Sequence, residues 1–273
     1  MELDASMIFD VHVKRMHEYK RQLLNALRLV DLYLRLKDDP DLDVVPRAVL
    51  FGGKAAPTYW VAKLIIKLIN CIAEVVNGDP AVNAKLRVAF IPDYRVSLAE
   101  KIFPGSDLSE QISTAGYEAS GTGNMKFALN GALTIGTMDG ANVEIAEAVG
   151  EENMFIFGMR VEEVVASKEK GYRPIEFVDA NPRLHRVIDF IRGSGLCSDE
   201  PGIFNPLVED LLHHDRFMLL ADFKDYLRAQ DDVDALYRQP DGWTRKAILN
   251  VARCGYFSSD RAVKEYAERI WKL

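Results

Sequence analysis

The chain has 273 residues, of which 48% are hydrophobic and 27% charged, as expected for a folded protein with a sizeable core rather than a disordered one. Its formal net charge of -7 argues against broad binding to nucleic acid or to anionic membranes. The three cysteines, Cys71, Cys197 and Cys254, have no metal-knuckle or redox-pair spacing. We therefore expect buried free thiols at Cys71 and Cys254 and a reducing, cytoplasmic environment.

The N-terminal region predicts a strand followed by a helix. Residues 8–14 are short and rich in β-forming side chains, and no charged-then-apolar export segment precedes them. Residues 18–36 carry leucine and valine at helical spacing, and the Asp-Asp-Pro cluster at 38–40 ends that pattern. The longest apolar region, residues 59–76, contains two lysines and an asparagine, so it predicts a buried helix rather than a membrane span. Pro57 suits the first turn of that helix.

Short apolar runs alternate with helical stretches along the first 160 residues. Further strands are predicted at residues 48–51, 86–91, 132–135 and 154–157. This alternation predicts an α/β fold with a Rossmann-like, doubly wound parallel sheet of at least five strands. The rest lacks clear strands and predicts an α-helical C-terminal extension packed on the sheet, with helices at residues 184–192, 205–213, 222–236 and 243–271.

The most unusual stretch is residues 111–130, which is dense in glycine, serine and threonine before it becomes helical at 125–129. A glycine-rich turn that leads into a helix offers backbone N–H groups to an anion. It is not a Walker A loop, and Lys126 stands where a dinucleotide fingerprint needs its third glycine. The pattern alone leaves two interpretations open, an anion-binding turn and a sharp strand-to-helix turn with a solvated lysine.

A second feature is the basic cluster Lys14, Arg15, Lys20 and Arg21. We expect the first two at the end of the first strand and the other two in the first turns of the next helix. Ligands of open α/β sheets bind at the carboxyl ends of strands, where these cations could hold one or two phosphates. The alternative is a solvated basic helix start. Cations at a helix N-terminus oppose its dipole, and a bound anion would remove that conflict.

Three other groups carry weaker signals. Gly52-Gly53 is interpreted as a tight turn between strand and helix, and Lys54 could line the cleft. His17 and Glu18 are adjacent helix residues, which rarely act on the same substrate atom. The run at 213–215, His-His-Asp, lacks a third metal ligand at fitting spacing, so a helix end is the favoured interpretation.

Taken together, these segments closely resemble the glycogen/starch/maltodextrin (α-glucan) phosphorylase family. The resemblance covers nearly the whole chain, and its most specific motif runs from Glu118 to Lys126. The matching stretches are residues 9–15, 17–22, 52–57, 93–100, 108–142, which is the longest, and 257–261.

The resemblance implies a two-domain glycosyltransferase-B architecture with the active site between the domains. This chain, residues 1–273, resembles the C-terminal, cofactor-binding domain, and the N-terminal domain is expected to be absent from it. In that family the parent enzyme is a homodimer. The implied reaction is phosphorolysis, in which an α-1,4-glucan and inorganic phosphate give α-D-glucose 1-phosphate with retention of configuration. The isolated domain is expected to be inactive or nearly so.

The family's cofactor is pyridoxal 5′-phosphate, and the resemblance places it on Lys126. Lys14 and the Thr122-Gly123 turn match residues that hold the cofactor phosphate, and Tyr94 matches one beside the pyridine ring. The family uses the cofactor's phosphate beside the substrate phosphate, rather than the aldehyde as an electron sink.

The same matching implies contacts to the substrates. Arg15 and Lys20 match groups that bind the substrate phosphate and stabilise an oxocarbenium-like transition state. The glucosyl hydroxyls are expected to contact Glu118, Ala119, Ser120 and Gly121, with Tyr19 nearby. Two competing hypotheses are a different pyridoxal-phosphate enzyme, such as an aminotransferase, and a non-catalytic module that binds a nucleotide or docks on a partner.

Overall fold

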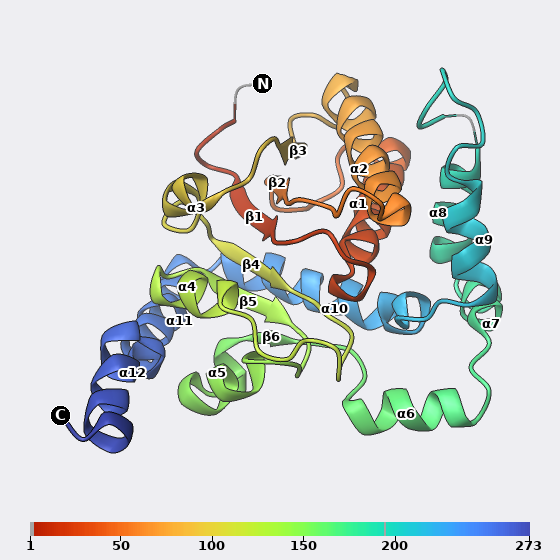
Figure 1. Ribbon diagram of the computed structural model, residues 1–273. Coiled ribbons are helices and arrows are strands. Elements are labelled where there is room, and N and C mark those ends of the chain that lie inside the picture. The colour runs from red at the N-terminus through yellow and green to blue at the C-terminus, as the bar shows by residue number, and fades with distance from the viewer. Residues whose placement is uncertain (1–2, 194) are drawn as a thin grey trace.

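The computed structural model describes residues 3–193 and 195–273. A six-stranded sheet forms its centre, with the strand order β3-β2-β1-β4-β5-β6 and every pair of neighbours parallel (Figure 1). This arrangement confirms the predicted doubly wound α/β fold. The strands are β1 (Ile8–Val13), β2 (Arg47–Gly52), β3 (Leu86–Ile91), β4 (Leu108–Gln111), β5 (Leu133–Gly136) and β6 (Phe155–Ile156).

Helices cover both faces of the sheet (Figure 1). α1 (Gln22–Asp38) and α2 (Trp60–Gly78) pack together on one face, and the connections α3 (Val96–Ile102), α4 (Gly123–Leu129) and α5 (Asn142–Val149) lie on the other. Right-handed crossovers give this result, since the chain moves outward from β1 in one direction and later from β4 in the other. With both faces covered, most residues of the strands are buried, which explains the apolar runs in every strand but β4.

One strand was not predicted. β4 has the sequence Leu-Ser-Glu-Gln, and all four residues are buried at the centre of the sheet between β1 and β5. Because three of its four side chains are polar, β4 does not appear as an apolar run in the sequence. They are tolerated because other buried polar groups bind them, for example Tyr226 and Gln230, which both donate to Glu110.

The start of the first helix was predicted too early. Glu18–Lys20 forms a separate 3₁₀ turn, and Arg21 then has a left-handed φ of 57° before α1 begins at Gln22. Similarly, α2 begins at Trp60 rather than near Pro57. The first shift changes the direction of the Arg21 side chain, as described below.

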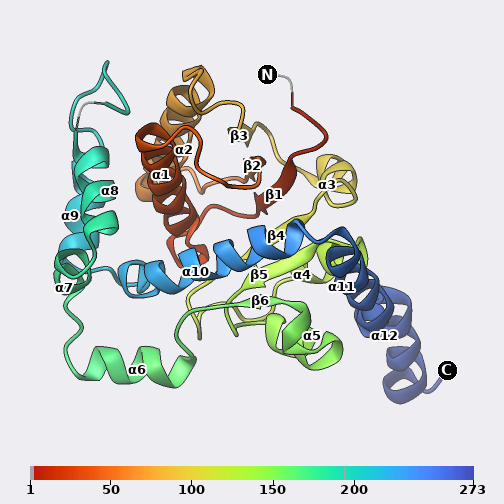
Figure 2. The same ribbon diagram turned by 180° about the vertical axis from the view of Figure 1, so that it is seen from behind.

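The C-terminal part is helical, as predicted, and α10 crosses behind the sheet next to α1 and β6 (Figure 2). Two helices that were not predicted, α6 (Val161–Glu169) and α7 (Pro174–Asp179), precede α8 (Pro182–Arg192), α9 (Asn205–His213) and α10 (Leu219–Tyr237). The long helix predicted at 243–271 is interrupted. It forms α11 (Pro240–Arg253), η3 (Cys254–Phe257), α12 (Ser259–Glu265) and η4 (Tyr266–Trp271). Within the described ranges, no helix is both long and apolar enough to cross a membrane.

Candidate functional site

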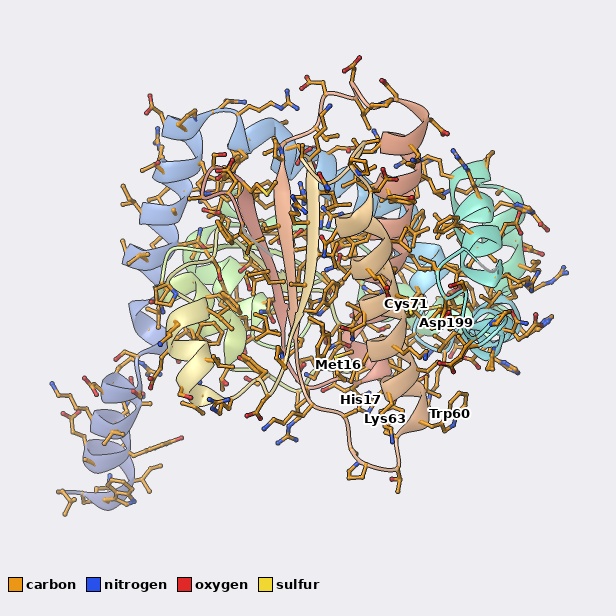
Figure 3. All side chains as sticks on the ribbon, turned by 90° about the horizontal axis from the view of Figure 1, so that it is seen from above. Met16, His17, Trp60, Lys63, Cys71 and Asp199 are labelled. Atoms are coloured by element: carbon orange, nitrogen blue, oxygen red, sulfur yellow. The ribbon has the colours of Figure 1, made fainter. Side chains whose placement is uncertain are left out.

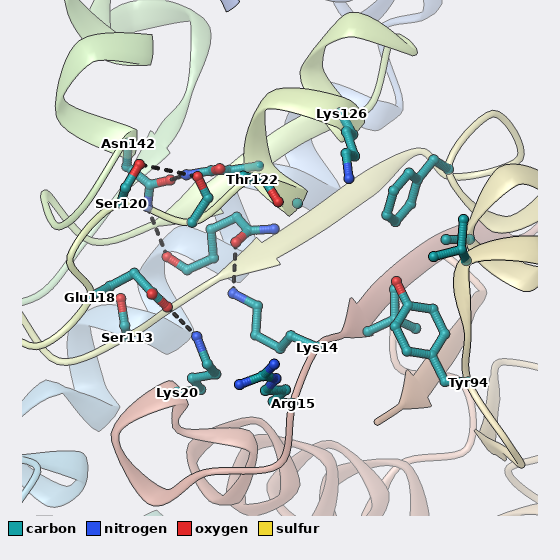
Figure 4. Close-up of a pocket in the computed structure, with 18 of the residues that line it drawn as sticks. Lys14, Arg15, Lys20, Tyr94, Ser113, Glu118, Ser120, Thr122, Lys126 and Asn142 are labelled. Atoms are coloured by element: carbon teal, nitrogen blue, oxygen red, sulfur yellow. Dashed lines mark hydrogen bonds and ion pairs between the residues drawn. The ribbon is translucent and has the colours of Figure 1, made fainter. Parts of the chain in front are cut away.

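A cavity of about 1100 Å³ opens at the carboxyl ends of the central strands. It lies where β1 meets β4, the point at which the strand order changes direction. Loops after these two strands leave the sheet toward opposite faces, which creates a crevice for ligands. Figure 4 shows side chains from the segments after β1, β3 and β4 converging on this space.

The cavity brings together all but one of the site residues that the family resemblance implied. The exception is Ala119, which is exposed between lining residues of the same segment. Lys54 also lines the cavity, whereas His17 and Glu18 are not among the lining residues. The predicted residues that line it are Lys14, Arg15, Tyr19, Lys20, Tyr94, Glu118, Ser120, Gly121, Thr122, Gly123 and Lys126.

The charge of the cavity suits anions. Its six basic side chains outnumber the three acidic ones, although the chain as a whole is acidic. A crevice with an excess of one charge concentrates ligands of the opposite charge. The basic residues are Lys14, Arg15, Lys20, Lys54, Arg95 and Lys126, and the acidic ones are Glu100, Glu118 and Asp139.

Lys14 follows directly after β1, and its ammonium group points into the cavity (Figure 4). The Lys14 Nζ donates a hydrogen bond of 2.6 Å to Gln111 Oε1, at the end of β4. Burial of the ammonium group and the nearby charge of Lys20 lower the pKa of Lys14 to about 7. An anion bound beside it would stabilise the charged form.

Lys20 and Glu118 form an ion pair within the cavity, and both side chains are largely buried. The Tyr19 hydroxyl donates to the other carboxylate oxygen of Glu118 at 3.4 Å, and the Lys20 ammonium lies 4.7 Å from the centre of the Tyr19 ring. The 3₁₀ turn at 18–20 therefore holds Glu118 in place through two of its side chains. Sequence reasoning placed both Lys20 and Glu118 in the site but did not predict that they pair.

Lys126 projects from α4 into the cavity, on the side opposite Lys14 and Lys20 (Figure 4). Thr122 precedes this helix, and its carbonyl accepts from the Lys126 backbone N–H at 3.2 Å. Gly121 has a φ of +83°, a conformation that side chains disfavour, and so permits the turn from the 118–121 segment into α4. The glycine-rich sequence thus determines where α4, the helix that carries Lys126, begins.

Asp139 is a site residue that sequence reasoning missed. Its buried carboxylate accepts hydrogen bonds from Ser113 Oγ at 2.8 Å and from the backbone N–H groups of Gly116 at 2.8 Å and Glu118 at 2.9 Å. These contacts hold the segment that presents Glu118 to the cavity. The only hint in the sequence was a polar residue shortly after a predicted strand.

Gln111 and Asn142 were also missed. Asn142 Nδ2 donates to the carbonyls of Gln111 at 3.0 Å and Thr137 at 2.9 Å, and Asn142 Oδ1 accepts from Asn124 Nδ2 at 3.0 Å. Asn142 therefore ties the end of β4 to the first turn of α4. Because these contacts span distant parts of the chain, no local pattern could reveal them.

Arg21 corrects the predicted cluster of four cations. Its side chain is fully buried away from the cavity, where Nη1 pairs with Asp222 Oδ2 at 2.6 Å and Nε donates to the Ile112 carbonyl at 2.7 Å. The left-handed backbone at this position points the guanidinium toward α10. Arg21 thus attaches the helical extension to the sheet and leaves three cations of that cluster, Lys14, Arg15 and Lys20, for the cavity.

The remaining weak signals have structural explanations. Glu18 accepts a hydrogen bond from the Tyr59 hydroxyl. His213 ends α9, as the favoured interpretation expected, and Asp215 accepts from the backbone N–H groups of Leu219 and Leu220. Among residues 3–193 and 195–273, no group of three histidine, cysteine or acidic side chains could hold a metal ion.

Comparison with known proteins shows the family to which the chain belongs. The carbohydrate phosphorylase family model matches residues 1–273. The chain is 57% identical over 271 residues to the brain form of glycogen phosphorylase from Rattus norvegicus and 56% identical over 273 residues to the liver form from Homo sapiens. These alignments cover 99% and 100% of this chain but only 32% of each relative.

The fold and the site define a doubly wound α/β domain with a crevice at its topological switch point that is lined by more basic than acidic side chains. The chain belongs to the carbohydrate phosphorylase family. It spans about a third of the length of the glycogen phosphorylases that it matches.

Proposed function

We propose that this chain forms the cofactor- and phosphate-binding half of an α-glucan phosphorylase active site. The complete enzyme would cleave an α-1,4-glucan with inorganic phosphate and release α-D-glucose 1-phosphate with retained configuration. The single observation that carries this proposal is the convergence of Lys14, Lys20, Glu118 and Lys126 on one crevice with an excess of positive charge. The matched relatives are named glycogen phosphorylases, and this supports an α-1,4-glucan as the substrate.

The lining of the crevice fits pyridoxal 5′-phosphate. Lys126 offers an amine that could carry the cofactor, and Lys14 is an amine whose pKa is lowered by burial and by the Lys20 charge, so a cofactor phosphate beside it would favour its charged form. Thr122 and Gly123 would hold the cofactor phosphate together with Lys14, and Tyr94 would lie beside the ring. When bound, the cofactor supplies a phosphate group beside the substrate phosphate.

Arg15 and Lys20 would bind the substrate phosphate and stabilise the positively charged, oxocarbenium-like transition state through that phosphate. Two adjacent phosphates repel each other by several kcal/mol, on the order of the interaction of like charges in a poorly screened site. The basic side chains offset this repulsion. The Glu118–Gly121 segment, with Tyr19 beside it, would orient the glucosyl unit by hydrogen bonds to its hydroxyls.

The relatives' greater length supports a larger parent protein. We propose that a preceding N-terminal domain completes a glycosyltransferase-B architecture, supplies most of the glucan contacts and allows a homodimer to form in the cytoplasm. The chain alone would then have little or no phosphorylase activity, because half of the cleft would be missing.

Cofactor binding provides the first test. The purified chain should develop the absorbance of lysine-bound pyridoxal phosphate on titration, and borohydride reduction followed by peptide mapping should place the label on Lys126. Lys126→Ala should abolish both signals. Lys224→Ala, which removes an exposed lysine of α10, is the matched control and should leave them unchanged. Equal labelling of many lysines would contradict the proposal.

Activity provides the second test. A chimera that joins this chain to the N-terminal two-thirds of one of the matched glycogen phosphorylases should form glucose 1-phosphate from maltoheptaose and phosphate. The Lys126→Ala chimera should not. Activity of the chain alone at the level of the chimera would contradict the proposed division of the active site.

A further inference from the structure

The fold brings together two cysteines that are distant in sequence. Cys71 is buried in α2, and Cys197 is half-buried in the segment that follows α8. Cys71 belongs to the main hydrophobic core and Cys197 packs against that core, and the two thiols are near enough for Cys197 to contribute to the raised pKa of Cys71. Figure 3 shows the same segment, labelled at Asp199, next to Cys71.

An ion pair also joins α2 to the segment that carries Cys197. Lys67, one helical turn before Cys71, pairs with Glu200, three residues after Cys197. The two residues thus join the same two segments as the cysteines do, and the Lys67 charge lies close to both sulfur atoms. Two neighbouring thiols on segments held together in this way can form a disulfide once their sulfur atoms approach to bonding distance.

The two thiols differ in reactivity. Burial and the hydrogen bond with Cys197 raise the pKa of the Cys71 thiol to about 11, despite the opposing effect of Lys67. A buried, protonated thiol reacts slowly with an external oxidant. Cys197 is the more accessible of the two, so an oxidant would reach it first.

We propose that Cys71 and Cys197 form a reversible disulfide when the protein meets a peroxide. The inference is independent of the proposed phosphorylase function. The third thiol, Cys254, is excluded because it is buried in a different cluster, beside α4 and α5. In a reducing environment, such a pair would be formed transiently by oxidants and returned by cellular dithiols.

The reaction balances with hydrogen peroxide as the oxidant. The Cys197 thiolate attacks one peroxide oxygen, the O–O bond breaks, and the products are a Cys197 sulfenic acid and water. The Cys71 sulfur then attacks the Cys197 sulfur; the S–S bond forms, the S–O bond breaks, and the leaving hydroxide takes the Cys71 proton as a second water. Each sulfur gives up one electron, and the peroxide accepts both.

The disulfide would join α2 to the segment between α8 and α9. A cross-link between residues so far apart in sequence restricts the unfolded chain strongly, so the oxidised protein should melt at a higher temperature than the reduced one.

Mass spectrometry of the whole chain tests the proposal. After treatment with excess hydrogen peroxide, the intact mass should fall by about 2 Da, for two lost hydrogens. Alkylation under denaturing conditions should then count one thiol instead of three, and dithiothreitol should restore all three. Peptide mapping should identify a Cys71–Cys197 link.

Three variants make the test specific. Cys254→Ser should still lose the two hydrogens, whereas Cys197→Ser should not. Cys71→Ser should leave a sulfenic acid on Cys197 that dimedone labels. Three unreacted thiols after peroxide treatment would overturn the proposal, and so would a disulfide that includes Cys254, a link between two chains, or direct over-oxidation of Cys197 in the unmodified protein.

Discussion

Lys14 and Gln111 lie at the carboxyl ends of adjacent strands, and a hydrogen bond of 2.6 Å joins the Lys14 ammonium to the Gln111 side-chain oxygen. The neutral amide orients the lysine without neutralising it. Its lowered pKa, about 7, leaves the charge of this group sensitive to pH in the physiological range. This property leads to a prediction about anion binding.

Sulfate should bind the cavity more weakly as the pH rises from 7 to 9. Sulfate keeps its charge over this range, whereas Lys14 loses its proton above its pKa of about 7, and the anion prefers the protonated form. The dissociation constant should therefore rise by up to about tenfold per pH unit. Isothermal titration calorimetry at several pH values measures this slope.

Lys14→Met is the matched variant for that experiment. Without the titrating amine, sulfate binding should be about tenfold weaker at pH 7, as expected for the loss of one charged hydrogen bond, and nearly flat with pH. The same slope in the variant and the unmodified protein would show that another group is responsible.

Replacing Arg21 should destabilise the protein strongly. Arg21 and Asp222 form a fully buried ion pair at 2.6 Å between the start of α1 and α10. Removal of one partner leaves a buried charge uncompensated, so Arg21→Met should lower the free energy of unfolding by about 3–5 kcal/mol. Urea denaturation followed by circular dichroism measures the loss.

The control for Arg21 is Arg238→Met. Arg238 pairs with Asp43 at 2.7 Å, but both side chains are exposed, so the change should cost about 1 kcal/mol or less. Comparable losses in the two variants would contradict the view that Arg21 attaches the helical extension to the sheet.

Gly53→Ala should damage the cavity. A Cβ at this position would lie 2.1 Å from the Lys14 carbonyl oxygen, so the end of β1 or the β2–α2 turn must move. We expect a loss of about 1–3 kcal/mol of stability, typical of an overpacked site, together with weaker sulfate binding. Thermal unfolding and calorimetry measure the two effects.

Gly78→Ala is the matched glycine control. Gly78 ends α2, and an added Cβ would meet no heavy atom within 4 Å. Alanine favours helix over glycine, so stability should stay equal or rise by up to about 1 kcal/mol, with unchanged sulfate binding. If Gly53→Ala behaved in the same way, the close approach to Lys14 would have no consequence.

The Glu110→Gln variant should gain stability relative to the unmodified protein as the pH rises. Burial and the negative charge of Asp10 raise the pKa of Glu110 well above its ordinary value. The folded state therefore binds a proton that the unfolded state releases, and the stability of the unmodified protein falls as the pH rises above about 4.5 toward the raised pKa. Glutamine cannot lose that proton.

The test compares urea midpoints at pH 6 and pH 9. Protonated Glu110 can donate to Asp10, and this contact would satisfy Asp10 Oδ1 and Glu110 Oε2, two buried oxygens that otherwise lack a partner. The midpoint of Glu110→Gln relative to the unmodified protein should increase between the two pH values. A constant or decreasing difference would show that Glu110 is already ionised in the folded protein.

The sequence predicted most elements whose information is local. Five strands appeared as short apolar runs because both faces of a parallel sheet are buried, and helix α9 was predicted with its observed bounds. β4 was missed because its buried residues are polar. Asp139 and Asn142 were missed because Ser113 and Gln111, which they contact, lie 26 and 31 residues away in the sequence.

By itself, the sequence determined the alternation of strands and helices, the glycine-rich turn before Lys126 and the type of chemistry that a basic crevice can perform. These depend on local propensity and on side-chain identity. Only the tertiary structure decided which charges share the crevice. Lys20 faces Glu118, Lys14 faces Gln111, and Arg21 turns away to Asp222. One left-handed residue and the order of the strands determine that choice, and neither is visible along the chain.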